Sequence, residues 1–206
     1  MWYSTIVAWS PNRIRLIDSK TNNMKIISIL LFAMITVASA NAQGKYFTKT
    51  GTISFKAGTA LEDIDAINKS VTSIFDPATG QIEFAVLIKG FEFRRGLMQE
   101  HFNENYMESE KLPKSTFKGK FNDVSKISFS KDGSYATTVK GTLEIHGVKK
   151  DVEMPGTIKV VNGVISSKAD FIVVVADYSI KIPGAVKDKI SPTVNIHIEC
   201  TYKAMK

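Results

Sequence analysis

Residues 97–118, LMQEHFNENYMESEKLPKSTFK, contain the one segment of this sequence with a clear helical pattern. Met98, Phe102 and Tyr106 recur every four residues with mostly polar residues between them, which is close to the period of an amphipathic helix. The pattern starts after a glycine and stops before Pro113, and both residue types interrupt helices. A single helix of this length is not stable alone. We therefore expect it either to close one side of a filled β-core, which the spacing alone favours, or to form a lid over a cavity inside that core.

The sequence on both sides of this helix alternates between apolar and polar residues, as β-strands do. In residues 82–89, for example, Ile82 and Phe84 fall on one face and Glu83 falls on the other. Short turns such as DPATG at residues 76–80 separate the alternating segments. We expect strands over residues 52–55, 70–75, 81–93, 115–121, 127–130, 135–146, 152–160, 165–180 and 193–202. About eight strands joined mainly by short turns predict an all-β fold, in which an antiparallel up-and-down sheet curls into a barrel.

The alternation also predicts which way individual side chains point. Residues 171–175, FIVVV, are apolar on both faces, so we expect this strand to be covered on both sides. His146 and His197 fall on polar faces, which predicts solvated surface histidines. Cys200 falls in an apolar set, which predicts an inward, largely buried thiol that reacts slowly.

The N-terminal part of the sequence has a different character. Residues 24–42 have a charged start, an apolar run over residues 26–37 and the small residues ASANA, which are the features of a secretory signal peptide. The apolar run is shorter than the roughly 20 residues needed to span a bilayer. Residues 1–23 fit no such pattern, and we expect them to be an overextended N-terminus outside the fold, with translation starting at Met24. The folded part is then a single domain of residues 43–206, located in the periplasm or secreted.

The composition of residues 43–206 excludes some function classes. This segment keeps 23 of the 27 basic and 19 of the 20 acidic residues, so the formal net charge falls from +7 to +4. Its lysines are scattered, which argues against a surface that binds nucleic acid. Cys200 is the only cysteine, so no intrachain disulfide can form. A segment of 164 residues can bury a sizeable core without one.

Residues that could carry catalysis are few. The sequence has no metal-protease, nucleophile-elbow or phosphate-binding motif. His101 lies on the predicted helix near Glu100, Glu104 and Glu108, whose four-residue spacing could ligate a metal but is far more typical of an exposed helical face. We expect His101 to pack where the helix meets the barrel and to donate a hydrogen bond there. We therefore predict no catalytic residue, no metal and no cofactor.

Several blocks in order along the sequence resemble one known family. A phenylalanine-rich strand at residues 84–93 precedes the pattern L-M-x-x-H-F-x-x-x-Y of residues 97–106 and the T-F-K-G of residues 116–119. The pattern G-x-L-x-I-H-G-V-x-K follows at residues 141–150, and a late strand at residues 171–180 contains Asp-Tyr. These blocks closely resemble the YceI-like family of exported bacterial proteins. The resemblance implies an antiparallel eight-stranded lipocalin-like barrel, closed partly by a helix, whose apolar channel binds polyisoprenoids or related long-chain amphiphiles.

These expectations combine into one predicted function, an exported carrier of a polyisoprenoid or fatty-acyl type of lipid. Each buried methylene contributes roughly 0.8 kcal/mol, so a long chain can bind with little polar recognition. Such a lipid in the interior would slow the reaction of Cys200 further. We predict that the ligand contacts Phe84, Val86, Ile88, Phe91, Phe93, Leu97, Met98, Phe102, Leu143, Ile145, Phe171 and Val173.

Two alternatives stay open at this point. One is a filled barrel that acts as an interaction module in envelope stress or surface attachment, without a lipid ligand. The other, less favoured, is a hydrolytic or metal-dependent enzyme that uses His101 and the neighbouring glutamates. We expect a long-chain lipid partner, no nucleic-acid partner and no transmembrane segment, and we leave a homodimer open.

Overall fold

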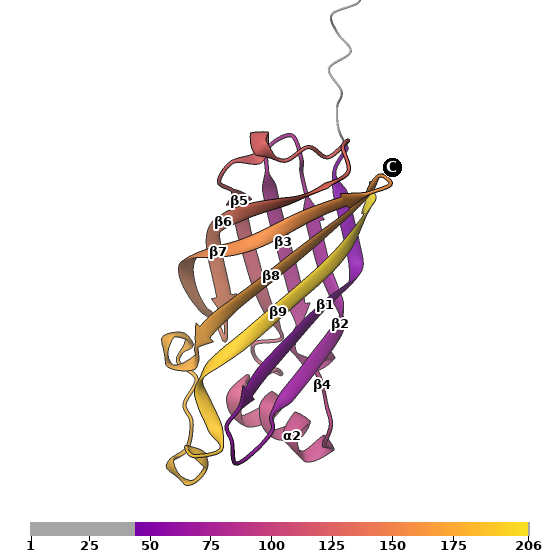
Figure 1. The fold of residues 1–206 in the computed structure, drawn as a ribbon. Helices are drawn as coiled ribbons and strands as arrows, with labels where there is room; N and C mark the ends of the chain where they lie inside the picture. The colour runs from indigo at the N-terminus through magenta and orange to yellow at the C-terminus, as the bar shows by residue number, and fades with distance from the viewer. Residues whose placement is uncertain (1–43, 206) are drawn as a thin grey trace, which may run out of the picture. The chain divides into compact units, whose positions relative to one another are not determined.

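A computed structural model describes residues 44–205, and strands dominate this part of the chain (Figure 1). The strands are β1 (Tyr46–Gly58), β2 (Asp65–Phe75), β3 (Gln81–Leu87), β4 (Glu92–Phe93), β5 (Lys114–Phe121), β6 (Gly133–Ile145), β7 (Val148–Val161), β8 (Val164–Val174) and β9 (Ile190–Ala204). The helix α2 (Gly96–His101) continues into a π-helical turn, η3 (Phe102–Tyr106). Short 3-10 turns are η2 (Ile88–Gly90), η4 (Val124–Lys126), η5 (Val175–Tyr178) and η6 (Gly184–Val186). Residues 1–43, which include the predicted signal peptide, lie outside the described residues.

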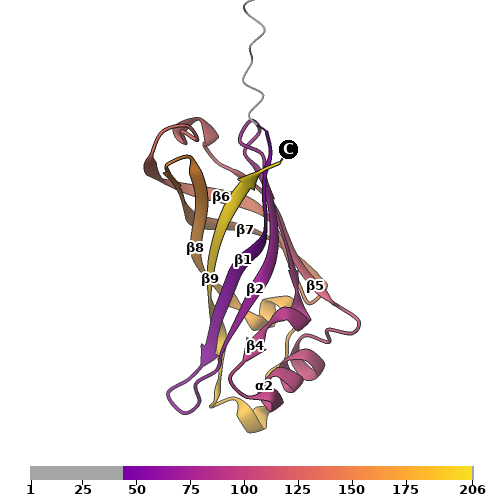
Figure 2. The same cartoon turned by 90° about the vertical axis from the view of Figure 1, so that its right-hand side faces the viewer.

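The strands form a closed antiparallel barrel. Their order in the sheet is β1-β9-β8-β7-β6-β5-β3-β2, and pairing of β1 with β2 closes the ring of eight. The two-residue strand β4 pairs only with β2, beside the ring. Every strand of the ring pairs with both of its neighbours, although β7 and β8 pair only through residues 156–161 and 164–169. The predicted eight-stranded antiparallel barrel is therefore confirmed (Figures 1 and 2).

The period-two pattern decides which side chains enter the barrel. In β3, Ile82 and Val86 are buried, whereas Glu83 and Leu87 are exposed, as the alternation predicts. β8 alternates in the same way, and its outer face is open, with Ile172 65% exposed. The prediction that residues 171–175 are covered on both sides is therefore wrong, because within the described chain no second layer packs on the outside of this strand.

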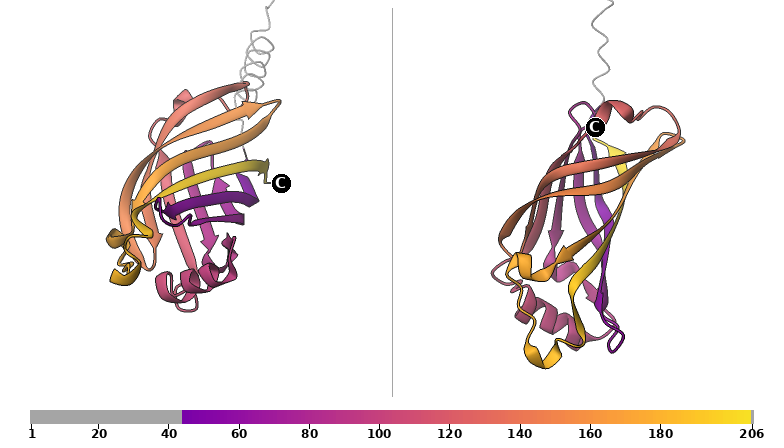
Figure 3. Two further views of the ribbon diagram at one scale, coloured as in Figure 1. Left: turned by 60° about the horizontal axis from the view of Figure 1, so that its bottom comes forward. Right: turned by 60° about the vertical axis from the view of Figure 1, so that its left-hand side comes forward.

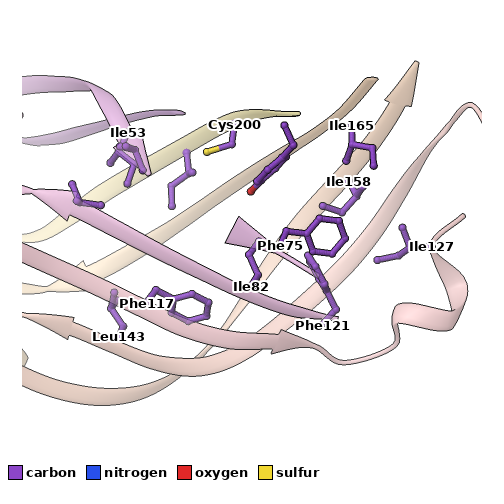
Figure 4. Packing of buried hydrophobic residues seen from close by; sticks show 14 of the residues in the cluster. Ile53, Phe75, Ile82, Phe117, Phe121, Ile127, Leu143, Ile158, Ile165 and Cys200 are labelled. Atoms are coloured by element: carbon purple, nitrogen blue, oxygen red, sulfur yellow. The ribbon is translucent and has the colours of Figure 1, made fainter. Parts of the chain in front are cut away.

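One end of the barrel is filled with aromatic side chains. The Phe75 ring lies 5.5 Å from Phe121, 5.0 Å from Phe129 and 6.0 Å from Tyr202, measured between ring centroids. Figure 4 shows Phe75 and Phe121 at this end beside Ile127. We call this group, formed by Phe75, Phe121, Ile127, Phe129 and Tyr202, the aromatic plug. It blocks one end of the barrel interior.

The helix and several turns lie at the other end. Figures 1 and 3 show α2 and the loop that follows η5 at the end of the barrel opposite the C-terminus. The C-terminus lies near the aromatic plug, because Tyr202 in the last strand belongs to it. The barrel thus has a plugged end and an end covered by a helix.

Three predicted strands end early or are absent in the structure. The strand expected over residues 81–93 stops at Leu87, because the buried Asn68 amide donates to the Leu87 carbonyl (2.9 Å) and the chain turns into η2. Residues 127–130 form no strand, because Ile127 and Phe129 turn inward to fill the plug. The strand expected to reach residue 180 ends at Val174 with the turn η5.

Candidate functional site

A cavity of about 520 Å³ occupies the half of the barrel that α2 covers. Its lining includes Phe55 from β1 and Leu97 from α2, whereas Phe75, Phe129 and Tyr202 of the plug do not reach it. Phe121 touches both regions and so forms the floor of the cavity. The result is a blind, mostly apolar pocket rather than a channel that runs through the barrel.

All twelve residues that the sequence analysis selected as ligand contacts lie in the cavity lining. They come from β3, η2, the residue between η2 and β4, β4, α2, η3, β6 and β8, and are Phe84, Val86, Ile88, Phe91, Phe93, Leu97, Met98, Phe102, Leu143, Ile145, Phe171 and Val173. Contact between these residues and a ligand stays a prediction.

Sequence reasoning missed part of the lining. Ile53 and Phe55 of β1 face the cavity, and the clear alternation of residues 52–55 could have selected them. Ile196 and Ile198 of β9 also line it. The lining residues of the loop before β9 are Ile180, Ile182, Val186 and Lys189. This loop has no strand or helix period, so no pattern in the sequence marked it.

The helix covers the cavity and does not close a filled core. No residue of α2 or η3 is buried, and Leu97 is 62% exposed although it lines the cavity. Met98, Phe102 and Tyr106, the predicted apolar stripe, all line the cavity. The structure therefore favours the lid over the core-closing helix, and we refer to residues 96–106 as the lid.

An aromatic cluster holds the lid against the barrel. The Phe102 ring lies 5.5 Å from Phe55, 5.6 Å from Phe91 and 5.0 Å from Phe93, measured between ring centroids. Aromatic pairs in this range are each worth about 0.5–1.5 kcal/mol beyond their burial. Phe102 is thus the main apolar anchor of the lid.

The helical geometry changes within the lid. The amide of Met107 donates to the Phe102 carbonyl (2.9 Å), five residues back, and the Asn103 side-chain amide donates to the Gln99 carbonyl (2.8 Å). The predicted helix therefore ends at Tyr106 with a π turn, well before Pro113. π turns are rare in proteins, and those that occur are often found at functional sites.

Charged side chains lie at the mouth of the cavity. The Glu62 carboxylate forms an ion pair with Arg95 at the start of the lid, and its other oxygen lies 3.7 Å from Lys189 Nζ. All three residues line the cavity. The hydroxyl of Thr59 donates to the carbonyl of Asp188 (2.7 Å), which holds the two loops beside each other.

His101 is not where the sequence analysis expected it. Its side chain is exposed at the cavity mouth, and within residues 44–205 its ring forms no hydrogen bond. Glu108 turns away from the lid to the β6–β7 turn, so the glutamate series does not converge around His101. In the described part of the chain, no group of three or more His, Cys, Asp or Glu side chains could hold a metal ion.

The other two histidines differ from each other. His146 is only 13% exposed, because its ring lies between Glu108 and the Tyr178 carbonyl at 3.2 Å from each, so the prediction of a solvated surface histidine is wrong for it. His197 is 32% exposed on the outer face of β9, as predicted, and pairs with Asp170 at 2.6 Å. The hydrogen bond with Asp170 is the main reason why the pKa of His197 is raised.

Cys200 is buried, as predicted, but it does not line the cavity. It is 3% exposed and lies beside Tyr202 of the plug, where burial raises the pKa of its thiol to about 11. Gly51 allows this packing, since a Cβ at that position would lie 2.5 Å from the Cys200 sulfur. A lipid in the cavity would therefore not contact this thiol directly, and its effect on the reaction of Cys200 stays a prediction.

Fold and site together define an eight-stranded antiparallel barrel with an internal apolar pocket covered by a short helix. The model of the YceI-like domain family matches residues 34–202, and the chain belongs to this family. The predicted family membership is confirmed.

Solved structures that share this fold include two with TM-scores above 0.6. A polyisoprenoid-binding domain from Saccharophagus degradans, implicated in plant cell wall breakdown, is 13% identical, with a TM-score of 0.69 over 79% of this chain and 99% of that one. BcnA from Burkholderia cenocepacia is also 13% identical, with a TM-score of 0.62 over 75% of this chain and 96% of that one. A comparison with curated proteins finds no match. Among the described residues, no helix has the length and apolar character needed to span a membrane.

Proposed function

We propose that this protein is an exported carrier of one long-chain apolar ligand, of the polyisoprenoid or fatty-acyl type. The observation that carries the proposal is the blind apolar cavity of about 520 Å³ beneath the lid. The fold it shares with a domain described as polyisoprenoid-binding supports the proposal. The ligand is held by burial of its chain, with no chemical step.

The size of the cavity suggests how much of a chain it holds. The cavity of about 520 Å³ is several times larger than the roughly 150 Å³ cavity that is known to hold benzene, so it has room for a chain of many methylene groups. At roughly 0.8 kcal/mol for each buried methylene, a chain of this length supplies enough free energy for tight binding. A longer polyisoprenoid would fill the cavity and leave the rest of its chain in the mouth.

Export is part of the same proposal and rests on the sequence of residues 24–42. Lipids with long chains are poorly soluble in water, so a carrier is useful where they must leave a membrane. We place the protein in the periplasm or outside the cell.

Binding can be tested with a pair of matched substitutions. Ala169 lines the cavity, whereas Ala85 points outward from β3, and both lie on strands of the barrel. We expect Ala169→Trp to fill part of the cavity and to weaken binding of palmitate and of geranylgeraniol, while Ala85→Trp leaves both affinities unchanged. Wild-type protein that binds neither lipid, or an Ala169→Trp variant that folds and binds as the wild type does, would contradict the proposal.

The natural ligand can be sought directly. Mass spectrometry of organic extracts of the protein purified from its native envelope is expected to show a long-chain lipid in stoichiometric amount. Protein that is consistently free of lipid would favour the alternative of an interaction module without a ligand, which the aromatic plug makes structurally reasonable.

A further inference from the structure

The side chains of Glu62, Arg95 and Lys189 at the cavity mouth carry more positive than negative charge. Glu62, Arg95 and Lys189 all line the cavity, and within the described chain Glu62 is the ion-pair partner of both cations. Its side chain is 19% exposed, whereas Arg95 and Lys189 are 63% and 55% exposed. Two accessible cations therefore share one largely buried carboxylate at the opening of an apolar pocket.

This arrangement has a cost that a purely apolar ligand would not offset. A ligand head at the mouth would displace water from Arg95 and Lys189, and removing water from a charged group is unfavourable unless the group is paired. A chain that fills the pocket brings its head to this mouth, because the aromatic plug closes the far end. A neutral head, such as an alcohol, would leave one cation without a full counter-charge.

We propose that the mouth binds the anionic headgroup of the ligand, with Arg95 and Lys189 as its partners. The ligand class is then an amphiphile with one carboxylate or phosphate group on a long apolar chain. This inference rests on the proposed function of lipid binding and adds the chemistry of the head.

The neighbouring charges support the assignment of these two residues. Arg94 is turned to the outside, where it pairs with Asp63 (3.1 Å) and Asp65 (3.4 Å), and it does not line the cavity. Arg94 and Arg95 thus point to different sides of the chain just before the lid, and only Arg95 reaches the mouth.

The experiment compares lipids that differ only in the head. Palmitate is paired with hexadecanol, and geranylgeranyl phosphate is paired with geranylgeraniol, so that carboxylate and phosphate are tested separately. We expect wild-type protein to bind at least one anionic lipid more tightly than its neutral partner, and added salt to reduce that difference. Lys189→Met and Arg95→Met should each weaken anionic binding by about fivefold, the effect of losing one exposed ion pair, and should change neutral binding much less.

The decisive variant is Glu62→Gln, because it removes the competing carboxylate. We expect it to strengthen binding of the anionic lipid, which is the opposite of the effect of Lys189→Met, and to change binding of the neutral lipid much less. If these ion pairs only held the loops in place, both variants would weaken binding of anionic and neutral lipids alike. That result would overturn the inference.

The control is Arg94→Met, which removes a cation next to Arg95 in sequence but outside the cavity. It should not change the preference for anionic heads. If wild-type protein binds charged and neutral partners equally well, the headgroup inference is wrong while the carrier function stands. If it binds none of the four lipids, the carrier function fails and this inference fails with it.

Discussion

The imidazole Nε2 of His146 lies 3.2 Å from the carboxylate Oε2 of Glu108 and joins the β6–β7 turn to the segment that follows the lid. The other ring nitrogen lies 3.2 Å from the Tyr178 carbonyl in η5. Both residues have positive φ angles, 51° for His146 and 43° for Glu108, so the backbone bends to bring them together. The second Glu108 oxygen accepts from Lys111 at 2.8 Å. We refer to this contact of three chain segments as the clasp.

The clasp should restrain the lid. We expect His146→Phe to keep the barrel folded but to speed hydrogen exchange of the lid amides, because the segment after the lid loses one of its polar attachments to the barrel. Release of a bound fluorescent fatty acid should also become faster. His197→Phe, on the outer face, is the matched control and should change neither quantity. Unchanged exchange in the lid of His146→Phe would show that the clasp does not control it.

The Phe102→Ala substitution should show whether residues 96–106 act as a lid over the cavity or as part of the core. The half-buried Phe102 ring touches three other rings, so we expect a loss of stability below the roughly 3–5 kcal/mol typical of a buried Phe→Ala change. Lipid affinity should fall about tenfold, which corresponds to about 1.4 kcal/mol of lost contact. Phe129→Ala in the plug should do the reverse, with a large loss of stability and unchanged affinity. Chemical denaturation beside lipid titration measures both, and a large stability loss with normal affinity in Phe102→Ala would rule out the lid.

The floor of the cavity should set the preferred chain length. Phe121 separates the cavity from Phe75 of the plug, so Phe121→Ala should extend the cavity into the filled end. We expect affinity to rise for a longer saturated fatty acid relative to palmitate, at a cost in stability of a few kcal/mol. The ratio of the two dissociation constants is the quantity to measure. A ratio equal to that of the wild type would mean that the plug collapses into the space.

Cys200 should react slowly with a thiol reagent in the folded protein. Its burial beside Tyr202 raises the thiol pKa to about 11, and the thiolate is the reactive form. Because Cys200 does not line the cavity, a bound lipid should change its rate only by stabilising the fold. Reaction with a chromogenic disulfide should be fast in denaturant and slow in buffer. Equal rates in denaturant and in buffer would show that Cys200 is not buried, and that the inward face of β9 is assigned wrongly.

The pair His197–Asp170 should contribute stability that depends on pH. The pKa of His197 is raised from its ordinary 6.5, chiefly by the hydrogen bond with Asp170, so the folded state favours the protonated ring. The contribution is fully present below pH 6.5 and is lost as the pH rises through the raised pKa. Denaturation of the wild type and Asp170→Asn across this range measures it, and the two stabilities should converge at high pH. If the stability of the two proteins depends on pH in the same way, the His197–Asp170 pair makes no pH-dependent contribution.

Much of the barrel could be predicted from local pattern. A strand has two faces, so the alternation in residues 82–89 is enough to place Ile82 and Phe84 inside and Glu83 outside. The same reasoning placed Phe84, Val86, Ile88, Leu143 and Ile145 inward, and the structure has all five at the cavity. It also predicted that Cys200 is buried.

The alternation of apolar and polar residues could not predict how far along the barrel axis an inward residue lies. Phe75 and Phe84 are both inward aromatic residues, yet Phe75 packs in the plug and Phe84 lines the cavity. Alternation describes a face and carries no information about depth, so only the register of the closed ring decides between a filled end and an open one. Contacts between polar residues in different turns could not be predicted from the sequence either. His146 and Glu108 lie 38 residues apart, and only the folded chain places their side chains in contact, since no local period relates two turns from different parts of the sequence.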